Sequence, residues 1–129
     1  MKQLRRKPDK QDLIITSEIL KNAIKEYRIN LTEPLGENRY QNIENAIASY
    51  TAALSVLTRD AFPENWAMTQ NNLGEAYRKR IRGDKAENIE LAIASFTAAL
   101  SVYTREAFPE QWAHRQNNLA TAYSDRIRG

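Results

Sequence analysis

The stretch that decides the fold is AIASYTAALSVL at residues 46–57, which returns as AIASFTAALSVY at residues 92–103. It belongs to a longer duplication, because residues 38–83 superimpose without a gap on residues 84–129 at an offset of 46, with 31 of the 46 pairs identical. A duplication of this length is typical of repeat proteins, in which each unit buries its apolar face against its neighbours. We therefore predict two repeats, 38–83 and 84–129.

Each repeat carries two apolar stripes with the spacing of amphipathic helices. In the first repeat one stripe runs from Ile43 to Leu57 at intervals of three and four residues, and the other runs from Trp66 to Ile81. This spacing predicts two helices in each repeat. A similar stripe between residues 13 and 31 precedes the first repeat. The sequence thus predicts five helices.

Pro63 separates the two predicted helices of the first repeat. Because proline disfavours helical backbone at the residue before it, we expect the first helix to end near residues 58–60. Proline is also well suited to the first turn of a helix, so we expect the second helix to begin at Pro63. Gly83 follows at the place of a left-handed C-cap, and we expect the second helix to end near it.

The short connections between these helices make consecutive helices antiparallel. Small residues lie on helix faces otherwise lined by large ones and let backbones approach closely; they are Ala46, Ala53, Ala92 and Ala99. We predict an all-α protein in which antiparallel helix-pair repeats form a short right-handed α-solenoid of about five helices. Residues 11–37 are predicted as a diverged N-terminal helix and loop, and residues 1–10 as a basic, disordered tail.

The charge of the chain is concentrated at its start. The 129 residues carry a formal net charge of +3, of which the first ten contribute +4, so that residues 11–129 are close to neutral. A short charged terminus is more often solvated than bound to a ligand. No stretch reaches the roughly 20 apolar residues of a membrane span, and the apolar run after the basic start is shorter than the core of a signal peptide. We expect a cytoplasmic protein with no membrane partner.

The residue types argue against catalysis and metal binding. The chain has no Cys, which excludes a disulfide framework, a thiolate nucleophile and a Cys-based metal site. Its only His, His114, corresponds to Met68 in the first repeat, and the sequence supplies no partner for general-base or metal chemistry. We predict a protein that is not an enzyme, with no catalytic residue, no metal and no cofactor.

One set of small and large residues has the order of a known repeat: Leu73, Gly74, Tyr77, Ala92, Phe96, Ala99 and Leu100. It resembles the tetratricopeptide repeat, whose usual unit has about 34 residues. The longer unit here and its Asn-Asn-Leu block, residues 71–73 and 117–119, look more like the kinesin-light-chain branch and the bacterial arrays that accompany caspase-like domains. The resemblance implies a scaffold that binds a peptide or protein segment along a concave face lined by the second helix of each unit.

The resemblance also places the binding residues. In the first repeat they would be Met68, Asn71, Asn72, Glu75, Arg78 and Lys79, and in the second His114, Asn117, Asn118, Thr121, Ser124 and Asp125. An Asn amide both donates and accepts hydrogen bonds, so a row of Asn can bind the backbone of an extended peptide whatever its side chains. The alternative is that these amides satisfy carbonyls or cap helices within the fold.

Two other functions remain open. The chain can be a self-associating structural spacer or a fragment of a longer array; we predict a homodimer through the last helix, with an interface at Leu119, Tyr123 and Ile127, because repeat arrays need a polar cap to stay monomeric. An RNA-reading helical repeat is disfavoured, because that mode usually has a basic face and residues 11–129 are near neutral.

Overall fold

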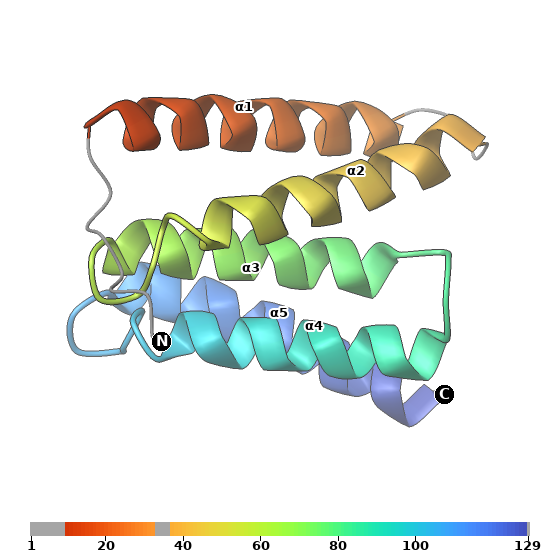
Figure 1. Cartoon of the computed structure of the whole chain (residues 1–129). Helices are drawn as coiled ribbons and strands as arrows, with labels where there is room; N and C mark the ends of the chain where they lie inside the picture. Colours follow the sequence, from red (N-terminus) through yellow and green to blue (C-terminus); the bar gives the residue numbers. More distant parts are fainter. Residues whose placement is uncertain (1–9, 33–36, 129) are drawn as a thin grey trace, which may run out of the picture.

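The computed structural model describes residues 10–32 and 37–128, with side chains at 10–25 and 40–128. These residues form five helices and no strand (Figure 1): α1 Lys10–Thr32, α2 Glu37–Leu54, α3 Pro63–Lys79, α4 Lys85–Leu100 and α5 Pro109–Arg128. The predicted all-α fold of five helices is confirmed, whereas the handedness of the solenoid stays a prediction. The predicted basic tail lies outside the described residues except for Lys10, which begins α1, and so does the connection at 33–36.

Successive helices are antiparallel and each packs on the next. Figure 1 shows α1, α2, α3 and α4 one after another from top to bottom, with α5 behind α4. In addition to these sequential contacts, α3 touches α5 directly. The second helices of the two repeats therefore lie side by side, as expected for stacked helix pairs.

The helix that precedes Pro63 ends earlier than predicted. Helix α2 stops at Leu54 rather than near residues 58–60. The chain then forms a turn in which the Thr58 carbonyl accepts from the Phe62 backbone N–H at 2.9 Å, and the Thr58 hydroxyl accepts from the Ala61 N–H at 3.3 Å. Helix α3 begins at Pro63, as predicted, because Phe62 has a non-helical backbone, with φ −139° and ψ 68°, and Pro63 occupies the first turn.

The end of α3 also differs from the prediction. The helix stops at Lys79, and Arg80 is extended, with φ −62° and ψ 134°. Gly83 does have the predicted left-handed backbone, with φ +79°, but it lies in the connection to α4 rather than at the cap of α3. Asp84 follows as the N-cap of α4, and its carboxylate accepts from the Ala86 backbone N–H at 3.2 Å. The left-handed Gly83 and the Asp84 cap thus form the short bend between α3 and α4.

The predicted close helix contacts are confirmed. Ala46, Ala92 and Ala99 have no exposed surface, and Ala53 is 1% exposed. The closest approach is between α3 and α4, where the ring of Phe96 packs directly on the backbone of Gly74: a Cβ placed at Gly74 would stand 2.7 Å from Phe96 Cε1. The small residue at position 74 is thus what allows α4 to bury Phe96 against α3.

Candidate protein-binding surface

Helices α3 and α5 are joined by a hydrogen bond between two of the predicted binding residues. The Asn118 amide Nδ2 donates to Asn71 Oδ1 at 3.0 Å, and Asn71 is only 5% exposed. The amide of Asn71 is therefore used within the fold, as in the structural alternative considered for the Asn row. Asn118 is half-buried and shares its amide between this joint and the surface.

A second contact between the same helices is an ion pair, and we call this contact and the Asn118–Asn71 hydrogen bond the two joints between α3 and α5. Arg78 donates from Nη1 to Asp125 Oδ2 at 3.3 Å, and its Nε lies 3.6 Å from Glu75 Oε1. The three side chains keep 21–25% of their surface exposed, so water weakens the pair without removing it. Both joints link residues that are 47 positions apart, one more than the repeat offset of 46.

The predicted residues on α5 separate into two groups that lie on adjacent sides of the helix. One group follows the i, i+4, i+7, i+11 spacing of a single helix face on α3 and on α5, and we name it the α3–α5 face: Met68, Asn72, Glu75, Lys79, His114, Asn118, Thr121 and Asp125. Asn117 and Ser124 are exposed but belong elsewhere. They correspond to Asn71 and Arg78, whose side chains point from α3 to α5, so on α5 they point away from α3.

The α3–α5 face offers polar groups of both kinds and one apolar side chain. Met68 is 40% exposed, and His114 and Thr121 are exposed on α5. His114 Nδ1 lies 2.6 Å from Arg115 Nη1, so the ring is held beside a cation. Among residues 10–32 and 37–128, no group of three or more His, Cys, Asp or Glu side chains could hold a metal ion. The face can therefore donate and accept hydrogen bonds and contact apolar groups.

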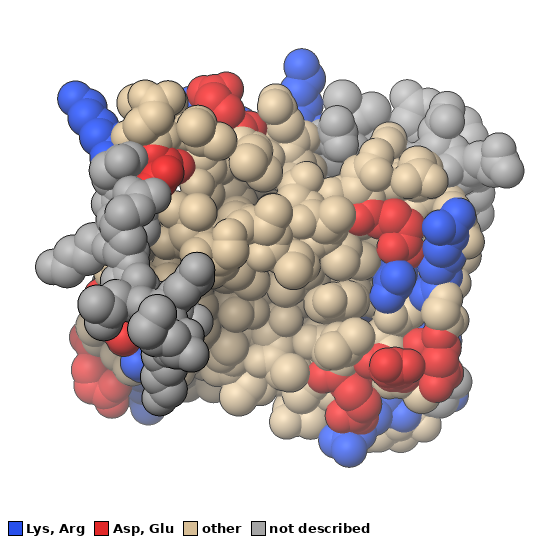
Figure 2. All heavy atoms as spheres, viewed as in Figure 1, with Lys and Arg blue, Asp and Glu red and all other residues tan. Residues whose placement is uncertain are grey.

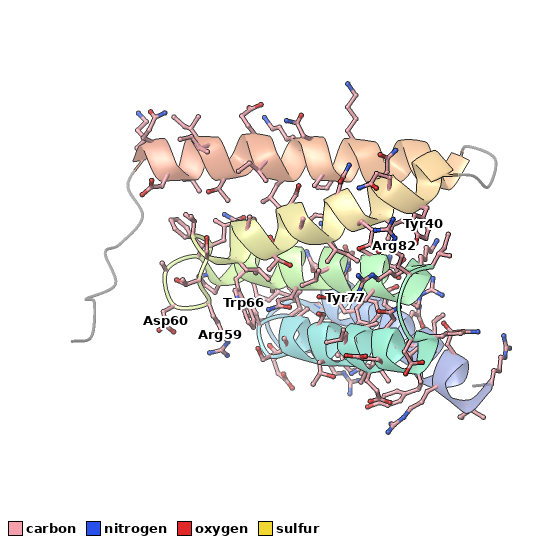
Figure 3. All side chains as sticks on the ribbon, turned by 45° about the vertical axis from the view of Figure 1, so that its right-hand side comes forward. Tyr40, Arg59, Asp60, Trp66, Tyr77 and Arg82 are labelled. Atoms are coloured by element: carbon pink, nitrogen blue, oxygen red, sulfur yellow. The ribbon has the colours of Figure 1, made fainter. Side chains whose placement is uncertain are left out.

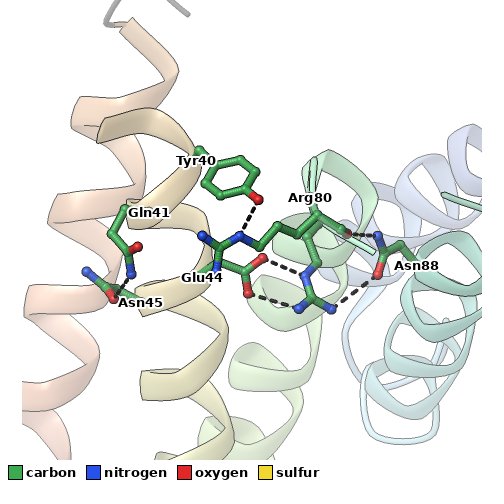
Figure 4. Close-up of polar contacts among 7 residues, drawn as sticks. Tyr40, Gln41, Glu44, Asn45, Arg80 and Asn88 are labelled. Atoms are coloured by element: carbon green, nitrogen blue, oxygen red, sulfur yellow. Dashed lines mark hydrogen bonds and ion pairs between the residues drawn. The ribbon is translucent and has the colours of Figure 1, made fainter. Parts of the chain in front are cut away.

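The most extensive polar cluster was not predicted from the sequence. Arg80 donates to both carboxylate oxygens of Glu44, at 2.7 and 2.9 Å, and to Asn88 Oδ1 at 3.3 Å (Figure 4). Asn88, 3% exposed, donates in turn to the Arg82 carbonyl at 2.7 Å. The hydrogen bond to Glu44 raises the pKa of Arg80. This cluster ties the end of α3 to α2 and α4.

Arg82 adds a second cation to this end of the molecule. Its guanidinium lies 4.3 Å from the ring centre of Tyr40 and donates to the Tyr40 hydroxyl (Figure 4). A signal for the neighbouring Arg80 cluster was present in the sequence: Glu44 and Arg80 recur as Glu90 and Arg126, which also pair at 2.8 Å. The Glu–Arg pair that is identical in both repeats thus makes a contact between helices in each of them.

The opposite end of the helices is built from the two long connections. Arg59, which Figure 3 labels beside Trp66, lies 5.9 Å from the Trp66 ring centre and donates from Nε to Ser101 Oγ at 3.3 Å. The Tyr103 hydroxyl donates to the Glu64 carbonyl at 3.2 Å, and burial raises the pKa of Tyr103. The connections 55–62 and 101–108 are therefore packed on each other and hold α3 and α5 in register.

The surface of α2 and α4 differs in character from the α3–α5 face. Figure 2 shows charged side chains gathered at the margins of the view and uncharged residues across its middle. Exposed positions of α2 and α4 carry the same small residues in both repeats, Ala48 with Ala94 and Thr51 with Thr97. The exposed positions in the second halves of α2 and α4 are thus kept, whereas Gln41 with Glu87 and Asn45 with Leu91 differ in their first halves.

Comparisons with protein-family models, with curated proteins and with solved structures each gave no match. The resemblance to the tetratricopeptide repeat therefore stays a prediction, and so does the cytoplasmic location. Among the described helices, none combines the length and the apolar character needed to cross a membrane.

Proposed function

We propose that this protein is a non-catalytic scaffold that binds an extended segment of another protein on the α3–α5 face. The observation that carries the proposal is where the two repeats differ. Of the 46 aligned pairs 31 are identical, yet three of the four pairs on this face differ: Met68 with His114, Glu75 with Thr121, and Lys79 with Asp125. Side chains vary where a ligand would contact them, while the buried alanines and the small exposed residues Ala48 and Thr51 are kept in the second repeat.

The fourth pair supports backbone recognition. Asn72 and Asn118 are identical, and each is half-buried on the face. No hydrogen bond joins the Asn72 amide to any of the described residues 10–32 and 37–128. The Asn118 amide uses its Nδ2 in the hydrogen bond to Asn71, which leaves its Oδ1 as an acceptor for a ligand. An amide with free donors and acceptors suits the peptide groups of an extended chain, whose pattern does not depend on sequence. The differing pairs would then select the ligand side chains.

Selection from a library of random linear peptides tests the proposal. We expect the chain to enrich a family of peptides, and the double variant Asn72→Ala with Thr121→Ala to weaken their binding by about tenfold or more, which corresponds to losing roughly one or two hydrogen bonds. Thr51→Ala with Thr97→Ala on α2 and α4 is the matched control and should leave the affinity unchanged.

Two results would count against the proposal. Enriched peptides that bind both double variants equally well would show that they contact another surface. Enrichment of no peptide, together with a salt-dependent shift of single-stranded RNA, would favour the nucleic-acid alternative. Circular dichroism of each variant confirms that the helices are kept, because all four positions lie at the surface or half-buried.

A further inference from the structure

Helix α5 exposes a stripe whose counterpart on the first repeat packs against α4, except for Ile81, which lies beyond α3 and is 53% exposed. On α3, Ala67 has no exposed surface and packs with Ala99 of α4, and Tyr77 packs against the cluster that includes Phe96. The corresponding side of α5 faces away from α3 and α4. We name it the α5 stripe, and it consists of Ala113, Gln116, Ala120, Tyr123 and Ile127, with Asn117 and Ser124 at its edge. Tyr123 is 42% and Ile127 87% exposed.

This stripe does not suit a helix like α4. Phe96 reaches the backbone of α3 only because Gly74 has no Cβ, and the corresponding residue on α5 is Ala120. A Cβ in that place would lie 2.7 Å from an equivalent aromatic ring, well inside van der Waals contact. Ser124 also lacks the charge that Arg78 uses to join α3 to α5. The α5 stripe therefore calls for an occupant with small residues at its centre.

A second α5 meets this requirement. Ala120 lies near the middle of α5, Pro109–Arg128. An antiparallel partner helix centred there places the following residues opposite one another: Ala120 with itself and, twice each, Ala113 with Ile127, Gln116 with Ser124, and Asn117 with Tyr123. Every large side chain then faces a small or flexible one, and no charged group lies on the stripe. A surface that is complementary to itself in this way suits a two-fold symmetric contact.

The charges at the helix ends select the antiparallel direction. The first turn of α5 carries Glu110, and its last turn carries Arg126 and Arg128. In an antiparallel pair Glu110 of each copy lies next to Arg128 of the other, and the two helix dipoles oppose each other favourably. A parallel pair would instead bring like charges together at both ends. We propose that two copies of this chain associate through an antiparallel, two-fold symmetric contact between their α5 helices, centred on Ala120.

The contact involves one helix about 30 Å long on each side, so it belongs to the small, reversible class of interfaces. Leu119, which was predicted in the interface, instead packs within the chain against the α4 cluster of Phe96. Tyr123 and Ile127 remain at the contact. The α3–α5 face and the α5 stripe share no residue, so that failure of either proposal can be recognised separately.

Disulfide trapping tests the geometry, because the chain has no Cys of its own. Under a glutathione redox buffer, Ala120→Cys should give a covalent dimer, since the two-fold axis brings the two copies of this position together. Ala113→Cys alone should not, because its two copies are 14 residues apart along antiparallel helices, about 21 Å. Ala113→Cys combined with Ile127→Cys should restore cross-linking. Ala52→Cys, exposed on α2, reports random collisions.

Three outcomes would overturn the inference. Cross-linking of Ala113→Cys as strong as that of Ala120→Cys would indicate a parallel pair, and equal cross-linking of Ala52→Cys would indicate collisions only. A chain that sediments as a monomer over a hundredfold concentration range, with no trapped Ala120→Cys dimer, would show that α5 does not self-associate. As a check without cysteines, Ala120→Arg should raise the dimer dissociation constant at least tenfold, whereas Ala52→Arg should leave it unchanged.

Discussion

Adding one methyl group at Gly74 tests whether the contact between α3 and α4 is as close as the structure shows. The new Cβ of Gly74→Ala would stand 2.7 Å from Phe96 Cε1 and 2.8 Å from Cδ1. Carbon atoms pack at about 3.5–4.0 Å, so the helices or the ring must move by roughly 1 Å. Phe96 has no exposed surface and packs with Ile89, Ala92 and Ala122, which leaves the ring no free space to move into.

Two opposing effects set the size of the change. Alanine is favoured over glycine inside a helix by about 1 kcal/mol. Overpacking of a well-filled core costs about 1–3 kcal/mol, and the 1 Å shortfall at an immobile ring puts Gly74→Ala in the middle of that range. We therefore expect a net loss of about 1 kcal/mol in the free energy of unfolding, which lowers the melting temperature by roughly 4 °C in a chain of this size.

Two further variants separate the effects. In the background of Phe96→Leu, where the ring is removed, Gly74→Ala should stabilise the protein, because only the gain in helix propensity remains. At the equivalent exposed position, Ala120→Gly should cost about 1 kcal/mol through propensity alone. Urea unfolding followed by circular dichroism measures the four variants and the original chain. If Gly74→Ala is more stable than the original chain, the contact with Phe96 is looser than the structure shows.

Two predictions concern the polar contacts. Glu44→Ala should lower the free energy of unfolding by about 1–3 kcal/mol, because it leaves Arg80 without its two charge-assisted hydrogen bonds. The equivalent Glu90→Ala should lower it by less than about 1 kcal/mol, since the Glu90–Arg126 pair is half exposed. Equal losses in urea unfolding would refute this difference. Burial raises the pKa of Tyr103 above its ordinary value of 10.0, so the folded state favours the neutral hydroxyl and stability is lost as the pH rises through the higher folded value. As the pH rises above about 10, the original chain should lose stability more steeply than Tyr103→Phe, and parallel curves would contradict this.

The helices could be predicted from the sequence because both their period and their duplication are properties of the sequence itself. Their ends were predicted less well, since contacts distant in the sequence decide them. Helix α2 stops at Leu54, where the chain turns through Thr58, and α3 stops at Lys79, where the chain turns toward α4 and Asn88 binds the Arg82 carbonyl. Arg126 and Arg128 correspond to Arg80 and Arg82 in the first repeat, yet they remain helical in α5. The local sequence alone therefore does not determine where α3 ends.

In the candidate site, too, the exposure of side chains could be predicted from the sequence, whereas the contacts between helices could not. Exposure of Met68, His114 and Thr121 follows from the helical period, and the structure places them on one face. The use of Asn71 by Asn118 could not be predicted, because it depends on how far α5 is displaced along α3. The side-chain contacts between α3 and α5 join residues 47 positions apart, while the repeat has a period of 46, and only the packed structure shows that one-residue shift.

The one-residue shift has a consequence for how such a chain can grow by copying its own unit. Each helix must present two adjacent residues, one to the helix before it and one to the helix after it. The Asn-Asn pair supplies both halves at once, because an amide can bond to another amide, so a copied unit is compatible with its parent without change. A cation has no such property. A faithful copy would set Arg78 against a second Lys79, and the joint is attractive only because position 125 has become Asp. Neutral amide joints survive duplication unaltered, whereas charged joints require the copies to diverge.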